Sequence, residues 1–110
     1  MEQDILTKTK SPDIKVFVEE ITDQEIREFS NFFSYQAGVE FFKMNMLSEI
    51  QFLEPETIKA VFKGFLDIET EVCIENLHVF AKCTCTTEEK GACKHIVALI
   101  LHAKEEIRKN

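Results

Sequence analysis

The sequence predicts an α+β fold, in which helices pack against a small antiparallel sheet. Three observations support this class: a helix-capping pattern near residue 22, alternating apolar and polar residues between positions 46 and 85, and an apolar stripe at helical spacing over residues 93–108. The chain has 110 residues, of which 45% are hydrophobic. We therefore expect one domain over residues 14–110, preceded by a flexible polar arm at residues 1–13.

Helical signals dominate the region that follows the arm. Thr22 and Glu25 have the three-residue spacing of a capping box, in which each residue satisfies a backbone N–H of the first helical turn. Asn45 is suited to the left-handed conformation that ends many helices. The predicted elements of this region are a short edge strand at residues 14–18, a helix at residues 23–33 and a second helix at residues 35–44.

The middle of the chain has the two-residue period of strands that bury one face. Pro55 ends the first of these stretches, because proline cannot donate to a strand ladder. The alternation predicts an antiparallel meander of three or four strands drawn from residues 46–52, 58–62, 68–74 and 79–85.

The last predicted element is a helix over residues 93–108. Its apolar positions recur three or four residues apart, which places them on one face. This stripe consists of Ile96, Ile100, Ala103 and Ile107, and it is widened by Val97 and Leu101.

Charge and hydropathy restrict the environments that suit the chain. The formal net charge is −7, which argues against strong non-specific DNA binding, although residues 79–110 carry six basic and four acidic side chains. Residues 1–10 lack the apolar core of a signal peptide, and the apolar run Ile96–Leu101 is too short to span a bilayer. We therefore expect a cytoplasmic protein in a reducing compartment, where clustered cysteines favour metal binding over disulfides.

Four potential metal ligands lie close together in the last third of the sequence. Cys83 and Cys85 are two residues apart in a predicted strand, so their side chains point to the same side. A polar spacer, residues 86–92, separates them from Cys93 and His95 at the start of the predicted helix. Three sulfurs and one imidazole form a standard tetrahedral zinc set, and four protein ligands leave no position for water. The sequence therefore predicts a structural Zn²⁺ site and no catalytic or cofactor-binding residues.

The cysteine spacing fits a disulfide, an iron–sulfur cluster or a set of ordinary core cysteines less well. Core cysteines have no reason to cluster with a histidine. A disulfide would leave one of the three clustered thiols unpaired. This ligand set also suits zinc better than it suits an iron–sulfur cluster. Cys73 lies among glutamates on the polar face of its predicted strand. Neighbouring carboxylates should raise its pKa, so we expect a bystander and not a nucleophile.

The pattern Cys-x-Cys…Cys-x-His resembles the SWIM zinc finger family. The segment Cys93–Leu101 is similar to the helix that follows the third ligand in family members, and Gly38-Val-Glu-Phe41-Phe42 resembles an aromatic G-x-x-Y-Y segment of bacterial examples, with phenylalanine in place of tyrosine. The similarity covers residues 33–103. Many members have a proline after the second cysteine, whereas this chain has Thr86, which affects the stiffness of the spacer and not the ligands.

The resemblance implies a non-catalytic interaction module in DNA-handling machinery, because family members are appended to Swi/Snf-type helicases or occur in small recombination factors. We expect a protein partner, only weak DNA contact by the isolated domain, and no membrane or small-molecule substrate. An enzyme using zinc-bound water or a cysteine nucleophile is the alternative. Two surfaces are candidates for partner contact: the spacer, and a side of the last helix on which Leu99 is expected to be exposed beside His102.

Overall fold

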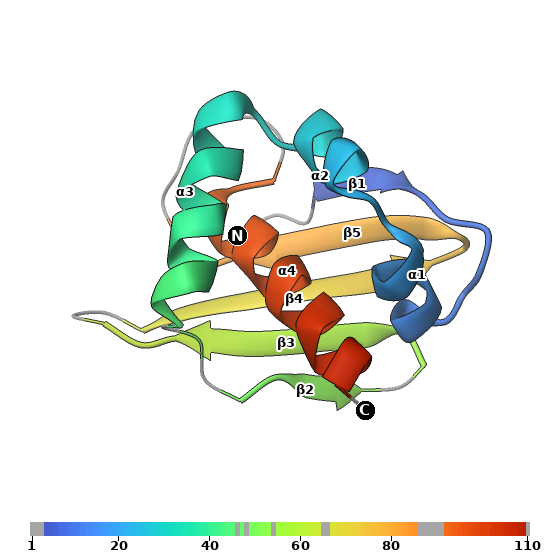
Figure 1. Ribbon diagram of the computed structural model, residues 1–110. Helices are drawn as coiled ribbons and strands as arrows, with labels where there is room; N and C mark the ends of the chain where they lie inside the picture. Colours follow the sequence, from blue (N-terminus) through green and yellow to red (C-terminus); the bar gives the residue numbers. More distant parts are fainter. Residues whose placement is uncertain are drawn as a thin grey trace.

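The computed structural model of the protein describes residues 4–45, 47, 49–53, 55–64, 67–85 and 92–109. Within these residues the chain forms four helices and one five-stranded antiparallel sheet, which confirms the α+β class. All four helices lie on the same face of the sheet (Figure 1). The strand order across the sheet is β1-β5-β4-β3-β2. In chain order the elements are β1 (Asp4–Lys8), α1 (Ile14–Glu20), α2 (Asp23–Phe29), α3 (Phe32–Met44), β2 (Gln51–Leu53), β3 (Thr57–Phe62), β4 (Ile68–Glu75), β5 (His78–Cys83) and α4 (Lys94–Lys109).

The first helix replaces the edge strand that the sequence suggested at residues 14–18. The side chain of Asp13 caps α1 by accepting a hydrogen bond of 2.8 Å from the backbone N–H of Lys15. Ile14, Phe17 and Val18 recur at helical spacing and are buried, and α1 contacts α4. The strand prediction is therefore wrong, because a local cap and a helical apolar face outweigh a five-residue alternation.

The helices α2 and α3 follow the local signals of the sequence closely. Both halves of the Thr22–Glu25 capping box form, and Asn45 adopts a left-handed backbone with φ 54° after α3. The helix α2 is shorter than the predicted helix at residues 23–33, because it ends at Phe29. Asn31 then caps α3 by accepting a hydrogen bond from the backbone of Ser34, so the second helix begins three residues before the predicted start.

The arm predicted at residues 1–13 contains a strand that the sequence reasoning missed. Residues 4–8 form β1, which pairs antiparallel with β5 and raises the sheet from the predicted three or four strands to five. Without β1, one edge of β5 would leave its backbone N–H and C=O groups without strand partners. The prediction of a loose arm is therefore wrong for these residues.

The predicted meander is confirmed in β3, β4 and β5, whose alternate residues face the helices. Ile58, Ala60 and Phe62 are buried on β3, and Val79, Ala81 and Cys83 are buried on β5. The first strand of the meander is reduced to β2, and two of the residues predicted in it, Met46 and Ser48, lie outside the described residues.

The core lies between the sheet and the helical layer, with α4 crossing the sheet next to α3 and α1 (Figure 1). Every residue from His95 to Ile100 is buried, including Leu99, whose side chain is 0% exposed. The expectation that Leu99 is an exposed anchor is therefore wrong, because α4 is covered by the sheet and by neighbouring helices. In the part of the chain described, no helix is both long and apolar enough to cross a membrane.

Candidate metal centre

The fold brings together the four residues predicted to bind metal. Cys83 ends β5, Cys85 follows two residues later, and Cys93 and His95 lie at the beginning of α4. Their potential ligand atoms all lie within 4.8 Å of one another, and all four residues are buried. This cluster could hold one metal ion between the last strand and the last helix.

The distance between Cys93 Sγ and His95 Nδ1 is close to that of a tetrahedral zinc site. Ideal Zn–S and Zn–N bonds place two sulfurs about 3.8 Å apart and a sulfur and a nitrogen about 3.5 Å apart. Here Cys93 Sγ and His95 Nδ1 are 3.9 Å apart. Small side-chain adjustments would therefore bring the donors to bonding geometry, and the donor set fits Zn²⁺ chemically.

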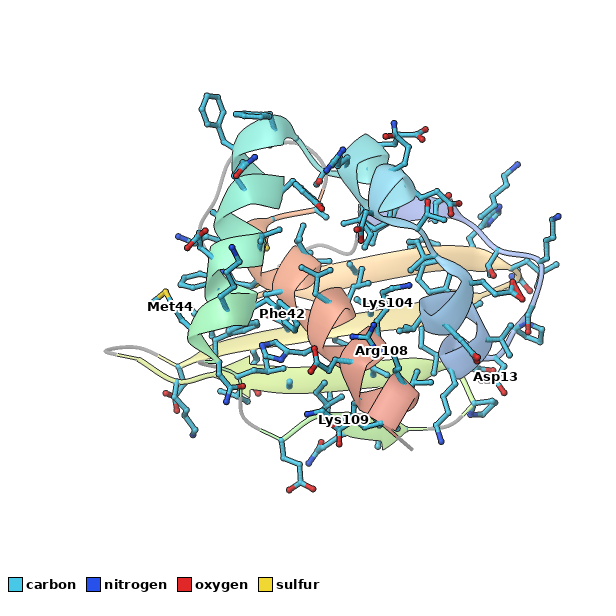
Figure 2. All side chains as sticks on the ribbon, viewed as in Figure 1. Asp13, Phe42, Met44, Lys104, Arg108 and Lys109 are labelled. Atoms are coloured by element: carbon cyan, nitrogen blue, oxygen red, sulfur yellow. The ribbon has the colours of Figure 1, made fainter. Side chains whose placement is uncertain are left out.

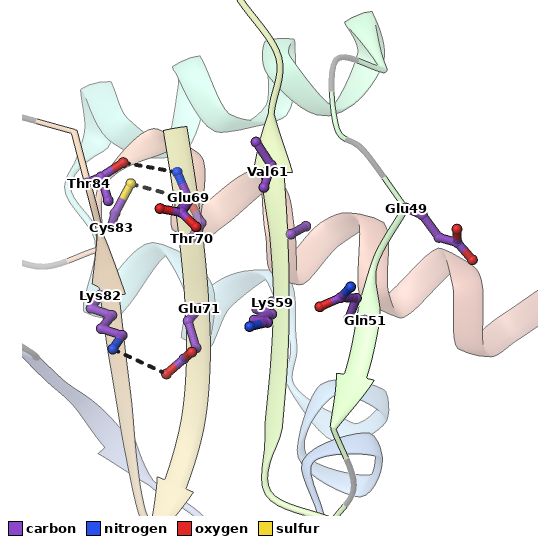
Figure 3. Close-up of a pocket in the computed structure, with 11 residues that line it drawn as sticks. Glu49, Gln51, Lys59, Val61, Glu69, Thr70, Glu71, Lys82, Cys83 and Thr84 are labelled. Carbon is purple, nitrogen blue, oxygen red and sulfur yellow. Dashed lines mark hydrogen bonds and ion pairs between the residues drawn. The ribbon is translucent and has the colours of Figure 1, made fainter. Parts of the chain in front are cut away.

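Backbone hydrogen bonds position both halves of the cluster. Beyond the end of β5, the Thr84 N–H donates to the Glu69 carbonyl at 3.0 Å, and the Glu69 N–H donates to Thr84 Oγ1 at 2.9 Å (Figure 3). On the returning chain, the N–H of Ala92 donates to the carbonyl of Phe29 at 2.9 Å. The residues that flank the ligands are thus tied to β4 and to α2, which fixes the directions from which the ligands enter.

Two phenylalanine rings pack against the imidazole of His95. The Phe41 ring of α3 stacks on it with centroids 5.3 Å apart, and the Phe62 ring of β3 meets it edge-on at 5.2 Å. Lys94 Nζ lies over the ring of Phe41, 5.0 Å from its centroid. Gly38 lies one turn before Phe41 and packs against Val97 of α4. The aromatic segment Gly38–Phe42 therefore contributes directly to the surroundings of the candidate metal ligands.

The electrostatics of the sulfurs favour a cation. Hydrogen bonds, first from Cys93 and then from His95 and Thr70, lower the pKa of the Cys83 thiol to about 3, although its burial acts in the opposite direction. The same hydrogen bond to Cys83 raises the pKa of Cys93 above its ordinary value, and burial adds to the effect. Metal binding requires deprotonated sulfurs, and a divalent cation would offset the negative charge that thiolates bring into this buried cluster.

The remaining candidates stay outside the cluster. Cys73 is buried on the opposite side of β4 from Thr70, and its pKa is raised first by burial and then by Glu71 and Glu75. The expected direction is confirmed, but burial is the larger cause. His102 packs edge-on against Phe42 at 4.8 Å, two turns along α4 from the ligands.

Sequence reasoning missed two contributors to the site, Thr70 and Phe62. The hydroxyl of Thr70 lies 3.2 Å from Cys83 Sγ. One signal was present in the sequence: Thr70 is a polar residue in an otherwise apolar row of β4, and such a residue needs a hydrogen-bond partner when buried. Nothing in the sequence links Phe62 to His95, because their contact depends on how α4 crosses β3.

Two hollows are formed by the described residues. One, of about 570 Å³, lies against the sheet and is lined by Thr70 and Cys83 together with charged residues that include Lys59, Glu71 and Lys82 (Figure 3). The other, of about 730 Å³, lies on the helical side, where Phe42, Lys104 and Arg108 are visible in Figure 2. The spacer predicted as a contact surface lies outside the described residues except for Ala92.

Comparison of the chain with protein-family models, with curated proteins and with solved structures finds no match. The resemblance to SWIM zinc fingers therefore rests on the motif residues themselves, and membership of that family remains a prediction. What the chain shows is a buried Cys₃His cluster that could bind a metal ion, within an α+β fold.

Proposed function

We propose that this chain is a non-catalytic zinc-binding module of the SWIM type, in which Zn²⁺ joins the end of β5 to the beginning of α4. The observation that carries the proposal is the convergence of Cys83, Cys85, Cys93 and His95 within 4.8 Å. Three thiolates and one imidazole suit Zn²⁺ better than hard cations, which prefer oxygen ligands. Zinc binding would then supply folding energy to the segment between strand and helix.

The ligand count distinguishes this proposal from the enzymatic alternative. A catalytic zinc needs an open position for water or substrate, and a cysteine nucleophile needs an accessible thiolate. All four donors here are protein side chains, and all four residues are buried. This arrangement supports a structural ion and gives the enzymatic alternative no specific observation in its favour.

Metal content tests the site. One zinc per chain should co-purify with the protein, and Cys83→Ser, Cys85→Ser, Cys93→Ser and His95→Ala should each lower it sharply. Cys73→Ser is the matched control, because Cys73 is also a buried cysteine but lies outside the cluster. Elemental analysis decides the matter: zinc loss in the Cys73 variant alone, or no zinc in the parent protein, contradicts the assignment.

The proposed role is contact with a protein, and the helical side offers a suitable surface. The 730 Å³ groove contains the apolar side chains of Phe42, Leu101 and Ile107, with Glu19 and Asp23 at its side. The basic residues of the groove already have partners. Lys104 Nζ donates to backbone carbonyls at the end of α1, and Arg108 Nη2 lies 3.8 Å from a carboxylate oxygen of Glu105. The bonds to neutral carbonyls leave Lys104 charged, so the described part of the groove has a small acidic excess, with Glu19, Asp23 and Glu105 against two basic side chains.

The apolar side chains and the small acidic excess of the groove favour a partner helix with an apolar stripe and basic edges. An amphipathic peptide of leucine and lysine is a suitable probe, with a scrambled peptide of the same composition as its control. Titration of the zinc-loaded protein should show preference for the amphipathic peptide, and Leu101→Asp should remove that preference while zinc content stays unchanged. Equal binding of both peptides would contradict a groove that recognises a helix.

The wider context we propose is cooperation with DNA-handling machinery, such as a Swi/Snf-type helicase, because SWIM modules are appended to such enzymes. Direct DNA contact should be weak, since the net charge is −7. Fluorescence anisotropy with duplex DNA tests this point. Sub-micromolar affinity at physiological salt would show that DNA, and not a protein, is the principal partner.

A further inference from the structure

A buried hydroxyl contacts one of the four cluster residues from outside the Cys-x-Cys…Cys-x-His motif. Thr70 of β4 lies directly opposite Cys83 of β5 in the strand register, and Thr70 Oγ1 is 3.2 Å from Cys83 Sγ (Figure 3). Thr70 is 2% exposed and Cys83 is 4% exposed, so water has little access to either group. Cys83 Sγ is therefore the hydrogen-bond partner of the Thr70 hydroxyl in this structure.

The direction of this hydrogen bond follows from the state of the sulfur. A metal-bound cysteine is a thiolate and has no proton to donate, so the hydroxyl of Thr70 must be the donor. Hydrogen bonds to a charged acceptor are stronger than those between neutral groups, and they count most where water is excluded. We propose that Thr70 is a positioning residue for the metal site, which orients Cys83 and stabilises its thiolate. This inference rests on the proposed zinc function.

The identity of the residue supports a specific role over simple packing. Ile68, Val72 and Ile74 occupy the other positions of the same row on β4, and valine would have nearly the same shape as threonine there. A buried hydroxyl without a partner destabilises the fold, whereas valine would not. Packing alone would thus favour valine, and the hydrogen bond to Cys83 is the interaction that threonine adds.

The backbone around Thr70 holds this pair in register. Thr70 and Cys83 belong to a continuous ladder between β4 and β5, and the hydrogen bonds between Glu69 and Thr84 extend the pairing by one residue beyond the strand end. The hydroxyl is therefore presented to the sulfur by the sheet. A substitution at Thr70 can change the hydrogen bond while leaving the ladder intact.

The test compares Thr70→Val, which removes the hydroxyl at constant shape, with Thr70→Ser, which retains it. Thr57→Val is the matched control, because Thr57 lies opposite Cys73 in the same sheet but far from the cluster in register. Zinc affinity is measured by competition with a chromogenic chelator. The thiolate-to-metal charge-transfer bands are recorded in protein loaded with Co²⁺, and circular dichroism checks the fold.

Thr70→Val should weaken zinc affinity by about tenfold or more, as substitutions next to metal ligands commonly do. It should also shift the Co²⁺ charge-transfer band, whereas Thr70→Ser and Thr57→Val should resemble the parent protein. Parental affinity and spectrum in Thr70→Val would overturn the role of Thr70 and leave the zinc proposal intact. Equal losses in Thr70→Val and Thr70→Ser would assign the residue to packing, and a parent protein that binds neither metal would overturn the zinc proposal itself.

Discussion

The helices α3 and α4 approach each other closely at Gly38, beside the Cys₃His cluster, and Gly38→Ala tests how strictly the fold depends on this contact. A methyl group at this position would lie 2.5 Å from Val97 Cγ1, 2.6 Å from Val97 Cβ and 3.0 Å from the carbonyl oxygen of Lys94. Val97 is fully buried, so its side chain has no free space into which to move. The added methyl should therefore push α3 away from α4.

Two opposing effects set the size of the change in the free energy of unfolding that Gly38→Ala causes. Overpacking a filled core costs roughly 1–3 kcal/mol. Alanine is favoured over glycine inside a helix by about 1 kcal/mol, which reduces the net effect. The two nearest atoms belong to a buried β-branched side chain and the third to the backbone. The overpacking cost should therefore lie toward the upper end of its range. We expect a net destabilisation of about 1–2 kcal/mol, or a decrease in Tm of roughly 4–10 °C.

The assay is thermal and denaturant unfolding of the zinc-loaded protein, with Gln36→Ala as a control at an exposed position of α3. Val97→Ala should destabilise by removing buried methyl groups, yet it also vacates the space that the new methyl needs. The double variant Gly38→Ala with Val97→Ala should therefore be more stable than the sum of the two single effects predicts. A Gly38→Ala protein that is more stable than the parent would show that helix propensity dominates and would refute this account of the contact.

Three further predictions concern single contacts. Phe41→Leu should weaken zinc affinity in chelator competition, because it removes the ring that stacks on His95; parental affinity would contradict this role. Thr22→Ala should lower the free energy of unfolding by about 1 kcal/mol through loss of the capping box, measured in urea, and an unchanged midpoint would argue against the cap. Burial lowers the pKa of His102, so the folded protein favours the neutral ring. Stability should then be full above about pH 6.5 and decline as the pH falls toward the lowered pKa, since the unfolded chain is protonated first. His102→Gln should reduce the loss of Tm between about pH 7 and about pH 5.5, and equal losses would contradict the prediction.

Local sequence signals predicted much of the backbone correctly. The Thr22–Glu25 box and the left-handed Asn45 form as predicted, because capping depends on atoms within a few residues of one another. The strands β3 and β5 also follow their alternation, because a period of two assigns each side chain to one face of the strand. The strand β4 does so except at Cys73, which is buried although it was predicted on the polar face. The errors arose where competing local signals were weak, as at residues 14–18, or where a strand depends on a distant partner, as β1 depends on β5.

The amphipathic pattern of α4 was informative about its existence but not about its surroundings. Its apolar stripe predicted one buried face, whereas the structure buries every residue from His95 to Ile100, including Leu99. A periodicity reports which side of a helix is most apolar. It does not report how many neighbouring elements cover the helix, which here include α1, α3 and three strands of the sheet.

The sequence by itself determined the candidate ligands, because the predicted strand places Cys83 near Cys85 and the predicted helix places Cys93 near His95, although β5 ends at Cys83 and α4 begins at Lys94. Only the tertiary structure decided which side chains support those ligands. Thr70 reaches Cys83 through strand register, and Phe41 reaches His95 through the approach of α3 to α4 at Gly38. Such contacts depend on the relative placement of whole elements, which no local pattern of residues encodes.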